Sequence, residues 1–236
     1  MKTLYIECAM GAAGDMLMAA LYELLDDKQA FVDQMNALGL PGVAVRPANA
    51  KTCGIAGTHM AVTVHGEEED DAGHAHARAA GETPHLHGHD HGHAHGHDHG
   101  HEHDHGHGEP HAHGEGDGHG HAHGHAHHHA TPGHIADIIG RLPLPEQVRA
   151  DARAVYDDIA RAEAKAHGCP VGDVHYHEVG ALDAVADVTG VCYALYLLRP
   201  DRIVVSPIHV GSGTVRCAHG VMPVPAPATA NLLAGV

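Results

Sequence analysis

Histidines spaced for metal binding fill the middle of this chain. Between His74 and His129 lie 23 of its 31 histidines, mostly in His-Gly-His, His-Ala-His and His-Asp-His runs. Neutral imidazole is a good ligand for Ni, Cu, Zn and Co, and alternate spacing lets several imidazoles surround one ion. The tract therefore predicts transition-metal binding, with release near pH 5 as the histidines protonate. The ligand candidates in its densest run are His89, His91, His93, His95, His97, His99, His101, His103, His105 and His107.

The tract by itself does not select the metal, because copper and zinc compete for the same imidazoles. Two interpretations without metal are an expression tag, although tags are short, pure and terminal, and a passive solubilising linker. Residues 66–129 contain almost no apolar side chain larger than alanine. Such a segment cannot offset its ordering entropy by burial, so we expect it to be disordered without metal.

A second group of candidate ligands lies in the second half of the chain. His175 and His177 alternate on an expected extended segment and so point to the same side, and Glu178 follows them. Asp183 and Asp187 are four residues apart on the next expected helix, where two carboxylates on one face repel. A shared cation or a buried base would remove that conflict, which predicts a metal or acid–base cluster. The alternative assigns Glu178 and Asp183 to helix capping and Asp187 to solvent.

Glycine-rich turns supply a third kind of candidate. Gly11 and Gly14 stand between an expected strand and helix, followed by Asp15. Glycines there allow a tight turn and the close approach of a ligand, and a helix N-terminus favours anions. We expect a phosphate turn; the alternative is a simple turn with Asp15 as the helix cap.

A later loop carries Gly213, His219 and Gly220 ahead of a proline-dense stretch. The glycines favour a loop that lies against a ligand, and the prolines set a stiff backbone. The pattern leaves open whether His219 is catalytic or a structural loop histidine.

Apolar periodicity indicates the elements that must position these residues. Strands or extended segments are expected over 3–8, 43–46, 59–65, 174–177 and 202–206, and helices over 15–25, 30–38, 132–141, 145–167, 181–198 and 228–233. Thr131-Pro132 reads as an N-cap and first helical residue, and Gly168 as a helix-ending glycine. Strands alternate with helices on both sides of the tract. We therefore predict one mixed α/β domain, formed by residues 1–65 and 131–236 and interrupted by a disordered insert at 66–130.

Composition excludes several classes of function. The formal net charge is −17, and residues 66–129 contribute about −12 of it. Such an excess of acids argues against nucleic acid as a partner. Five dispersed cysteines with no CxxC spacing favour reduced thiols in a cytoplasmic protein. The sequence contains neither a signal-peptide pattern nor a stretch suited to crossing a membrane, so no membrane partner is expected.

Taken together, the motifs resemble the nickel-insertion proteins of nickel-pincer cofactor synthesis, the LarC family. The resemblance rests on GAAGDM after the first strand, the histidine insert, VHYHEVGALDAVADV and HGVMPVPAPATANLL, in that order over nearly the whole chain. It implies an enzyme, a lyase-type nickel insertase, that places Ni(II) in pyridinium-3,5-bisthiocarboxylic acid mononucleotide. The product would be the cofactor of lactate racemase. It also implies consumption of CTP, with Mg or Mn as an option, and apo lactate racemase as an optional partner.

Carried onto this sequence, the resemblance assigns roles that the residues alone leave open. Asp15, His177, Glu178 and His219 are the expected catalytic residues. Gly11, Gly14, Gly213 and Gly220 are expected to contact substrate. His175, His177, Asp183 and Asp187 are the expected nickel ligands of the folded part, with the tract as a store that raises the local nickel concentration.

The chain departs from the family pattern in two respects. Glu7 and Ala13 stand where the family usually has Asp and Ser. The chain also ends at Val236, where relatives continue into a C-terminal domain associated with CTP. We therefore expect an N-terminal portion that binds nickel but needs the C-terminal portion for insertion. The alternatives are a non-enzymatic nickel-storage chaperone and a zinc- or copper-buffering protein.

Overall fold

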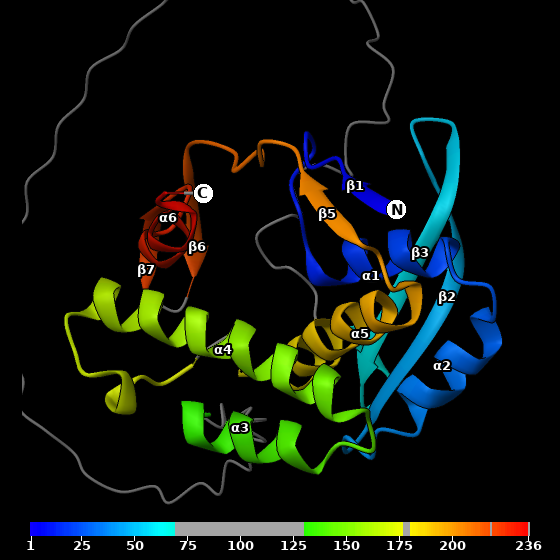
Figure 1. Ribbon diagram of the computed structural model, residues 1–236. Coiled ribbons are helices and arrows are strands. Elements are labelled where there is room, and N and C mark those ends of the chain that lie inside the picture. Colours follow the sequence, from blue (N-terminus) through cyan, green and yellow to red (C-terminus); the bar gives the residue numbers. More distant parts are fainter. Residues whose placement is uncertain (69–129, 177–179, 218, 236) are drawn as a thin grey trace, which may run out of the picture. The chain divides into compact units, whose positions relative to one another are not determined.

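The computed structural model describes residues 1–68, 130–176, 180–217 and 219–235, in which helices and strands alternate (Figure 1). The histidines of the tract, His177 and Glu178 therefore lie outside the described residues. A mixed α/β architecture is confirmed. Its strands are β1 (Thr3–Ile6), β2 (Val43–Thr52), β3 (Ile55–Val64), β4 (Glu67–Glu68), β5 (Arg202–Val205), β6 (Thr214–Cys217) and β7 (Gly220–Pro223). Its helices are α1 (Gly14–Glu23), α2 (Lys28–Asn36), α3 (Pro132–Arg141), α4 (Glu146–His167), α5 (Leu182–Leu198) and α6 (Pro227–Leu233), with a 3-10 turn at Val171–Asp173.

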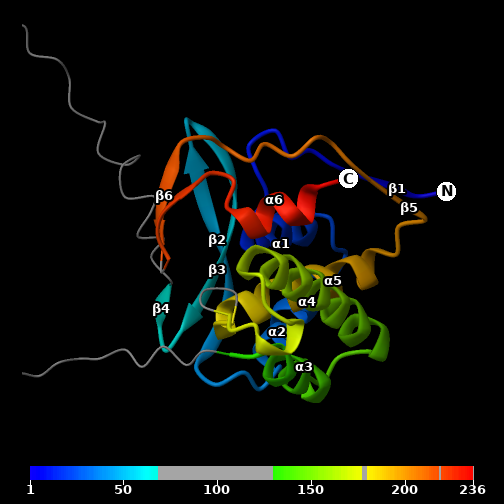
Figure 2. The same cartoon turned by 90° about the vertical axis from the view of Figure 1, so that its left-hand side faces the viewer.

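Strands from the two halves of the sequence pair with each other. The first strand, β1, runs parallel to β5, in a register from Thr3 opposite Arg202 to Ile6 opposite Val205. Helices α1 and α5, which follow β1 and precede β5 in the chain, pack against each other (Figures 1 and 2). Residues before and after the tract thus build one folded unit.

The β2–β3 hairpin is longer than the sequence pattern predicted. Its ten-residue strands pair from Val43–Val64 to Thr52–Ile55, and Cys53 and Gly54 form the turn with φ of 51° and 84°. Positive φ at both turn residues gives the turn the twist that a two-residue hairpin favours. The outer parts of both strands are largely exposed, so they lack the apolar alternation that marks a strand in sequence.

A core of Met, Phe and aliphatic side chains holds α1, α2 and α5 together. Phe31 is fully buried and stacks on Tyr193, with ring centroids 5.7 Å apart. Gly190 of α5 permits a close approach, since a Cβ there would lie 2.5 Å from the sulfur of Met18. Met suits such a site because its unbranched side chain adapts to irregular gaps.

The helices around α4 follow the sequence prediction closely. Thr131 caps α3 by accepting a hydrogen bond from the His134 amide at 3.3 Å, and Pro132 is the first helical residue. Gly168 ends α4 in the left-handed conformation at φ 65°. In contrast, the β6–β7 hairpin was not predicted. The last helix, α6, packs on α4, where the Asn231 amide donates to the Ala162 carbonyl at 3.2 Å.

Among the described helices, none has the length and apolar character needed to cross a bilayer.

Candidate functional site

The candidate site lies where the carboxyl ends of β1 and β5 meet the first turns of α1 and α5. Hydrogen bonds join the two loops that leave the strands: the Cys8 amide donates to the Ser206 hydroxyl at 2.8 Å, and the His209 amide donates to the Cys8 carbonyl at 3.0 Å. Ligands of open parallel sheets commonly bind at this end of the strands. The loop between Cys8 and Ala13 therefore leads to the region where a ligand is expected.

The first turn of α1 is closed by a carboxylate from α5. Ala13 is the N-cap and offers no side-chain hydrogen bond. Instead, the carboxylate of Asp187 lies against this turn, and the Asp15 amide has a small lowering effect on its pKa. Gly14 makes this approach feasible, because a Cβ at that position would lie 2.6 Å from the Cβ of Asp187 and 2.8 Å from its Oδ2. The place where the sequence suggested a phosphate is thus held by the chain's own carboxylate.

Three aspartates are brought together at this junction, and we call Asp15, Asp183 and Asp187 the carboxylate cluster. Burial, followed by the charges of Asp15 and Asp183, raises the pKa of Asp187 to about 7, against a smaller lowering effect of the Asp15 amide. One oxygen each of Asp183 and Asp187 is buried without a hydrogen-bond partner. In the described part of the chain, no salt bridge joins Lys or Arg to any of the three. The cluster therefore gathers three acids that no Lys or Arg of the described residues neutralises.

The sequence placed Asp183 and Asp187 in one motif and Asp15 in another. The structure joins them, because the packing of α1 on α5 brings the second turn of α5 to the start of α1. Ala181 is the N-cap of α5, and Asp187 faces Gly14 rather than open solvent. The structure therefore contradicts the alternative in which Asp187 faces solvent. It also contradicts the alternative in which the side chains of Asp15 and Asp183 cap their helices.

Two further residues near the cluster had no signal in the sequence. Tyr156 of α4 is buried. Its burial is the largest cause of the raised pKa of its phenol, followed by the charges of Tyr176, Asp183 and Asp187. The sequence pattern marks Tyr156 only as one residue on the apolar face of an expected helix. His59 of β3 lies with Nδ1 4.0 Å from Asp15 Oδ2 and Nε2 3.5 Å from Glu68 Oε1. Only the folded hairpin brings His59 to α1.

The described residues on either side of the tract are Glu68 and Ala130. Glu68, the last residue described before the tract, is the one that faces His59. On the other side, the carbonyl of Ala130 accepts a hydrogen bond from the amide of Tyr176 at 2.8 Å, and the ring of Tyr176 packs on that of Tyr156 with centroids 5.9 Å apart. Glu68 therefore lies beside His59, which is close to Asp15, and Ala130 lies beside Tyr176, which packs on Tyr156.

The remaining predicted site residues are dispersed or lie outside the described part. His175 is exposed, and the described residues contain no group of three His, Cys, Asp or Glu side chains placed to hold a metal ion. His177, Glu178 and the tract histidines are not described, so their predicted roles stay predictions. His219 lies against His167 at the end of α4, with ring centroids 4.9 Å apart.

The three outer glycines of the predicted substrate site behave differently from Gly14. Gly11 has φ 92°, and a Cβ there would lie 3.5 Å from the His209 carbonyl oxygen. Gly213 and Gly220 also have positive φ, but a Cβ on either would meet no described atom within 4 Å. Their conformation explains the glycines without a ligand, so substrate contact at these positions stays a prediction.

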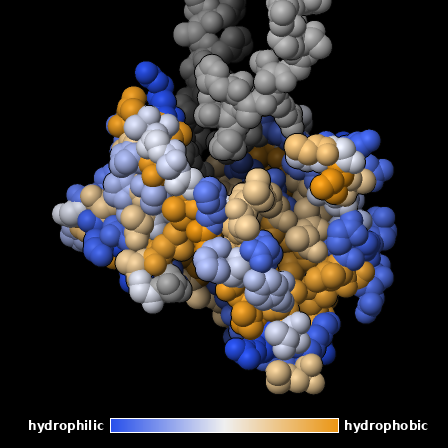
Figure 3. All heavy atoms as spheres, turned by 90° about the horizontal axis from the view of Figure 1, so that it is seen from above, coloured by the Kyte–Doolittle hydropathy of each residue, from blue (hydrophilic) through white to orange (hydrophobic). Residues whose placement is uncertain are grey.

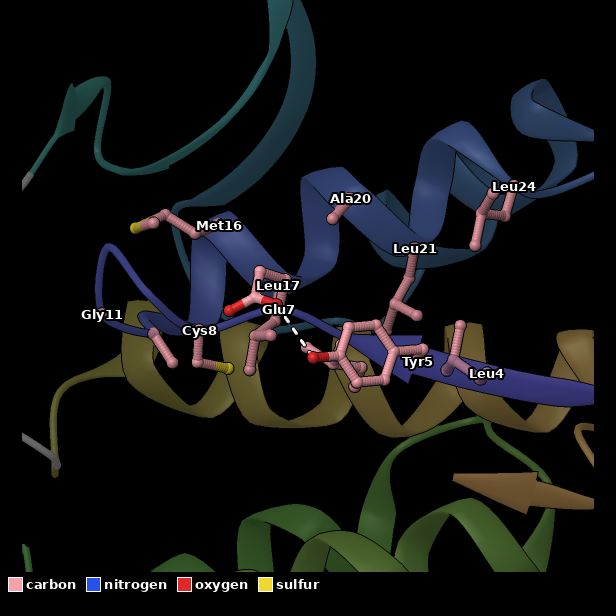
Figure 4. A pocket seen from close by; sticks show the side chains of 12 residues that line it. Leu4, Tyr5, Glu7, Cys8, Gly11, Met16, Leu17, Ala20, Leu21 and Leu24 are labelled. Carbon is pink, nitrogen blue, oxygen red and sulfur yellow. Dashed lines mark hydrogen bonds between the residues drawn. The ribbon is translucent and has the colours of Figure 1, made fainter. Parts of the chain in front are cut away.

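An apolar groove adjoins the carboxyl end of β1 and runs along α1 (Figure 4). Its volume is about 210 Å³. At its polar end the Tyr5 hydroxyl donates to Glu7 Oε2 at 2.9 Å. Hydrogen bonds from Tyr5, then Ser206 and the Ala9 amide, lower the pKa of Glu7. Glu7 thus accepts a hydrogen bond at the polar end of the groove.

Comparison with known proteins identifies the family. The family model described as "Nickel insertion protein" matches residues 4–236, so the chain belongs to the nickel insertion protein family. A Geobacillus kaustophilus protein named pyridinium-3,5-bisthiocarboxylic acid mononucleotide nickel insertion protein is 33% identical over 236 residues, covering 100% of this chain and 46% of the relative. A putative nickel insertion protein of Methanococcoides burtonii is 33% identical over 235 residues, covering 100% of this chain and 44% of the relative.

A third relative, from Desulfitobacterium hafniense, has the same printed name as the Geobacillus protein and is 45% identical over 115 residues, covering 46% of this chain and 29% of the relative. The chain spans less than half the length of the first two relatives. No solved structure matches the chain significantly.

Proposed function

We propose that this chain is the nickel-binding portion of an enzyme that inserts Ni(II) into pyridinium-3,5-bisthiocarboxylic acid mononucleotide. The observation that carries the proposal is the carboxylate cluster, in which Asp183 and Asp187 each keep a buried oxygen without a partner. The described residues alone do not complete a metal site, but a divalent cation held by Asp183 and Asp187 with ligands from outside the described residues would bind those oxygens and relieve the repulsion. The family supplies the identity of the cation, since its relatives are named for nickel insertion.

Carboxylate ligands fit a site that must release its metal. Oxygen donors bind nickel less tightly than soft sulfur donors do, and the proposed substrate carries two thiocarboxylates. Nickel held by Asp183 and Asp187 would therefore move towards the substrate sulfurs. Further ligands are proposed from His175, His177 and Glu178, which precede α5 in the sequence. Gly11, Gly14, Gly213, Gly220 and His219 stay proposals for contacts with the nucleotide.

The histidine tract serves the same reaction as a nickel store. The tract is covalently joined to the folded part through Glu68, which lies near His59, and Ala130, which lies near Tyr176, so ions that it holds would stay tethered to the folded part. Tethering replaces diffusion from solution by a high effective concentration. The tract loads the cluster, whereas the folded part determines where nickel is handed over.

The complete reaction belongs to the longer family protein. We propose that insertion consumes CTP, with Mg or Mn as its counter-ion, and that the portion of the family protein absent from this chain takes part. The nickel-pincer product would serve lactate racemase. On this proposal the 236-residue chain binds nickel and, supplied with CTP and the mononucleotide, does not complete insertion.

The test separates the cluster from the tract. A variant lacking residues 74–129 is titrated with Ni(II) by isothermal calorimetry, then compared with the same variant carrying Asp183→Asn and Asp187→Asn. The expected result is a large loss of bound nickel on deletion, a remaining nickel site, and at least tenfold weaker binding after the double substitution. Asp137→Asn with Asp151→Asn, both on exposed helix surfaces, is the matched control.

Two outcomes contradict the proposal. Equal nickel affinity with and without Asp183 and Asp187 would remove the cluster as a nickel site. Unchanged insertion by a complete family protein carrying the aligned substitutions would favour a storage chaperone instead. Competition with Zn(II) and Cu(II) in the same titration tests the buffering alternative.

A further inference from the structure

Strands β1 and β5 have the sequences of buried parallel strands. They read Thr-Leu-Tyr-Ile and Arg-Ile-Val-Val, which are nearly continuous apolar runs. Parallel sheets are normally covered on both faces, and their strands are apolar for that reason. A sheet of two strands is also too small to be stable without cover. The sequences of β1 and β5 therefore predict that other parts of the protein cover both faces and the edges of this two-stranded sheet.

Within the described residues, much of the pair is exposed. Tyr5 is 59% exposed, Ile203 45% and Val205 48%. Paired residues of a parallel ladder point to the same face, and Tyr5 is paired with Val204 whereas Ile203 is paired with Leu4. Tyr5 and Ile203 therefore lie on opposite faces, and both faces expose apolar side chains. Within the described residues, each strand has only the other as a neighbour.

The groove beside β1 continues the exposed apolar area of the two strands along α1. Its walls include Leu4, Ile6 and Leu21, and two exposed residues, Met16 and Leu24, stand along its rim (Figure 4). Apolar side chains are also seen at the molecular surface in the view from above (Figure 3). We call Tyr5, Leu24, Ile203, Val205 and this groove the β1–β5 surface. Several large apolar side chains gathered around one small sheet indicate a contact that the described residues do not supply.

The length of the family protein indicates what covers this surface. The chain accounts for 46% of one full-length relative and 44% of another, so more than half of the family polypeptide lies outside it. A second copy of the chain fits less well, because each copy has a formal net charge of −17 and like charges oppose association. An edge strand with free amides and carbonyls is, in addition, a ready template for another strand.

We propose that the portion of the family polypeptide absent from this chain docks on the β1–β5 surface, adds a strand to the sheet and packs apolar side chains into the groove beside β1. This inference rests on family membership and on the exposed strands, and it is independent of the nickel reaction. It also has a consequence for the site. The loops that leave β1 and β5 border the carboxylate cluster, so the docked portion would be held beside the place where we propose that nickel binds.

Hydrogen exchange measured by mass spectrometry tests this in two intact proteins, the 236-residue chain and the full-length Geobacillus kaustophilus relative. The aligned strands of the relative are expected to exchange at least tenfold more slowly than β1 and β5 do here. Strands β2 and β3 near Val45 and Met60, which are buried in this chain, should exchange at similar rates in both proteins.

A substitution gives a second readout that does not depend on exchange. Ile203→Asp should lower the Tm of this chain by no more than about 2 °C, since the side chain is half-exposed, whereas aspartate at the aligned position of the relative should lower its Tm by about 5 °C or more. Val155→Asp, at a 38% exposed position of α4, is the matched control and should have a small effect in both proteins.

The proposal is overturned if β1 and β5 exchange at the same rates as the aligned strands of the relative. It is also overturned if aspartate at position 203 and at the aligned position lowers the Tm of both proteins equally. Sedimentation of the chain alone supplies the remaining outcome: a dimer that Ile203→Asp dissociates would show that a second copy covers the β1–β5 surface.

Discussion

The N-termini of α1 and α3 solve the same problem in different ways. Each helix begins with amide groups that lack intrahelical acceptors. At α3, Thr131 accepts from the His134 amide and Pro132 has no amide to satisfy, so three neighbouring residues complete the turn. At α1, Ala13 contributes no side-chain acceptor, and the carboxylate of Asp187 arrives from α5.

The difference shows where the molecule retains an unfavourable interaction. The α3 end is neutral and self-contained. The α1 end gathers Asp187 with Asp15 and Asp183, and burial and repulsion raise the pKa of Asp187 to about 7. A serine at position 13 would provide a local cap without that repulsion. The gathering of three acids at this end is consistent with the metal-binding role that we propose for them.

The largest effect is expected from Gly14→Ala. The new Cβ would lie 2.6 Å from the Cβ of Asp187, a contact that only a shift of α1 against α5 can relieve. We expect the free energy of unfolding to fall by about 3 kcal/mol, measured by urea denaturation. The control is Gly133→Ala in the first turn of α3, where a Cβ meets no described atom within 4 Å. That variant should be neutral or up to about 1 kcal/mol more stable, and equal losses in both would contradict the comparison.

Removal of the charge of Asp187 should have the opposite sign. Asp187→Asn relieves the repulsion from Asp15 and Asp183 and keeps a carbonyl that can accept from the Asp15 amide. We expect about 2 kcal/mol of added stability at pH 8 without metal. Asp137→Asn on the exposed face of α3 is the control and should change little. A destabilised Asp187→Asn variant would mean that the charge itself holds α1 to α5.

The stability that Asp187→Asn adds should depend on pH, which tests the repulsion at the start of α1 further. The pKa of Asp187 is about 7 in the folded state and near its ordinary 3.8 when unfolded, so the folded state binds the proton more tightly. The contribution of Asp187 to stability is therefore fully present below about pH 4, declines as the pH rises to about 7, and is constant above that. The stability difference between wild type and Asp187→Asn should grow over this interval in a series of urea titrations. A difference that is flat with pH would place the pKa of Asp187 at its ordinary value.

The smallest effect concerns the local cap. Thr131→Ala removes the acceptor for the His134 amide and should lower the free energy of unfolding by about 1 kcal/mol. Ala13→Ser is the companion variant at α1. It should add almost nothing, because the carboxylate of Asp187 already lies against that turn. A gain of about 1 kcal/mol from the serine, seen in thermal or urea unfolding, would show that Asp187 is a poor substitute for a cap.

Local signals in the sequence predicted most of the helices. Periodic apolar residues and the Thr131-Pro132 start placed α3, and Gly168 marked the end of α4. The hairpins were harder, because the outer half of β2–β3 is exposed and the strands of β6–β7 have four residues each. Such segments have too few apolar positions to establish a period of two.

For the candidate site, the sequence supplied the residue types but not their grouping. It paired Asp183 with Asp187 through their helical spacing, and this pairing is fixed by the period of the helix alone. It assigned Asp15 to a phosphate turn, since nothing local relates residue 15 to residue 187. His59 and Tyr156 carried no signal, because their contribution depends on which surfaces of β3 and α4 face α1 and α5.

The sequence by itself determined what short-range chemistry can determine: a tract rich in metal ligands, the helix ends at Thr131 and Gly168, and a pair of like charges one helical turn apart. Only the tertiary structure decided that α1 packs on α5, that the Gly14 surface is what allows Asp187 to approach, and that a third aspartate joins the pair. The reason is physical. Hydrogen bonds within a turn depend on neighbours in the chain, whereas burial and repulsion depend on which distant surfaces exclude water from each other.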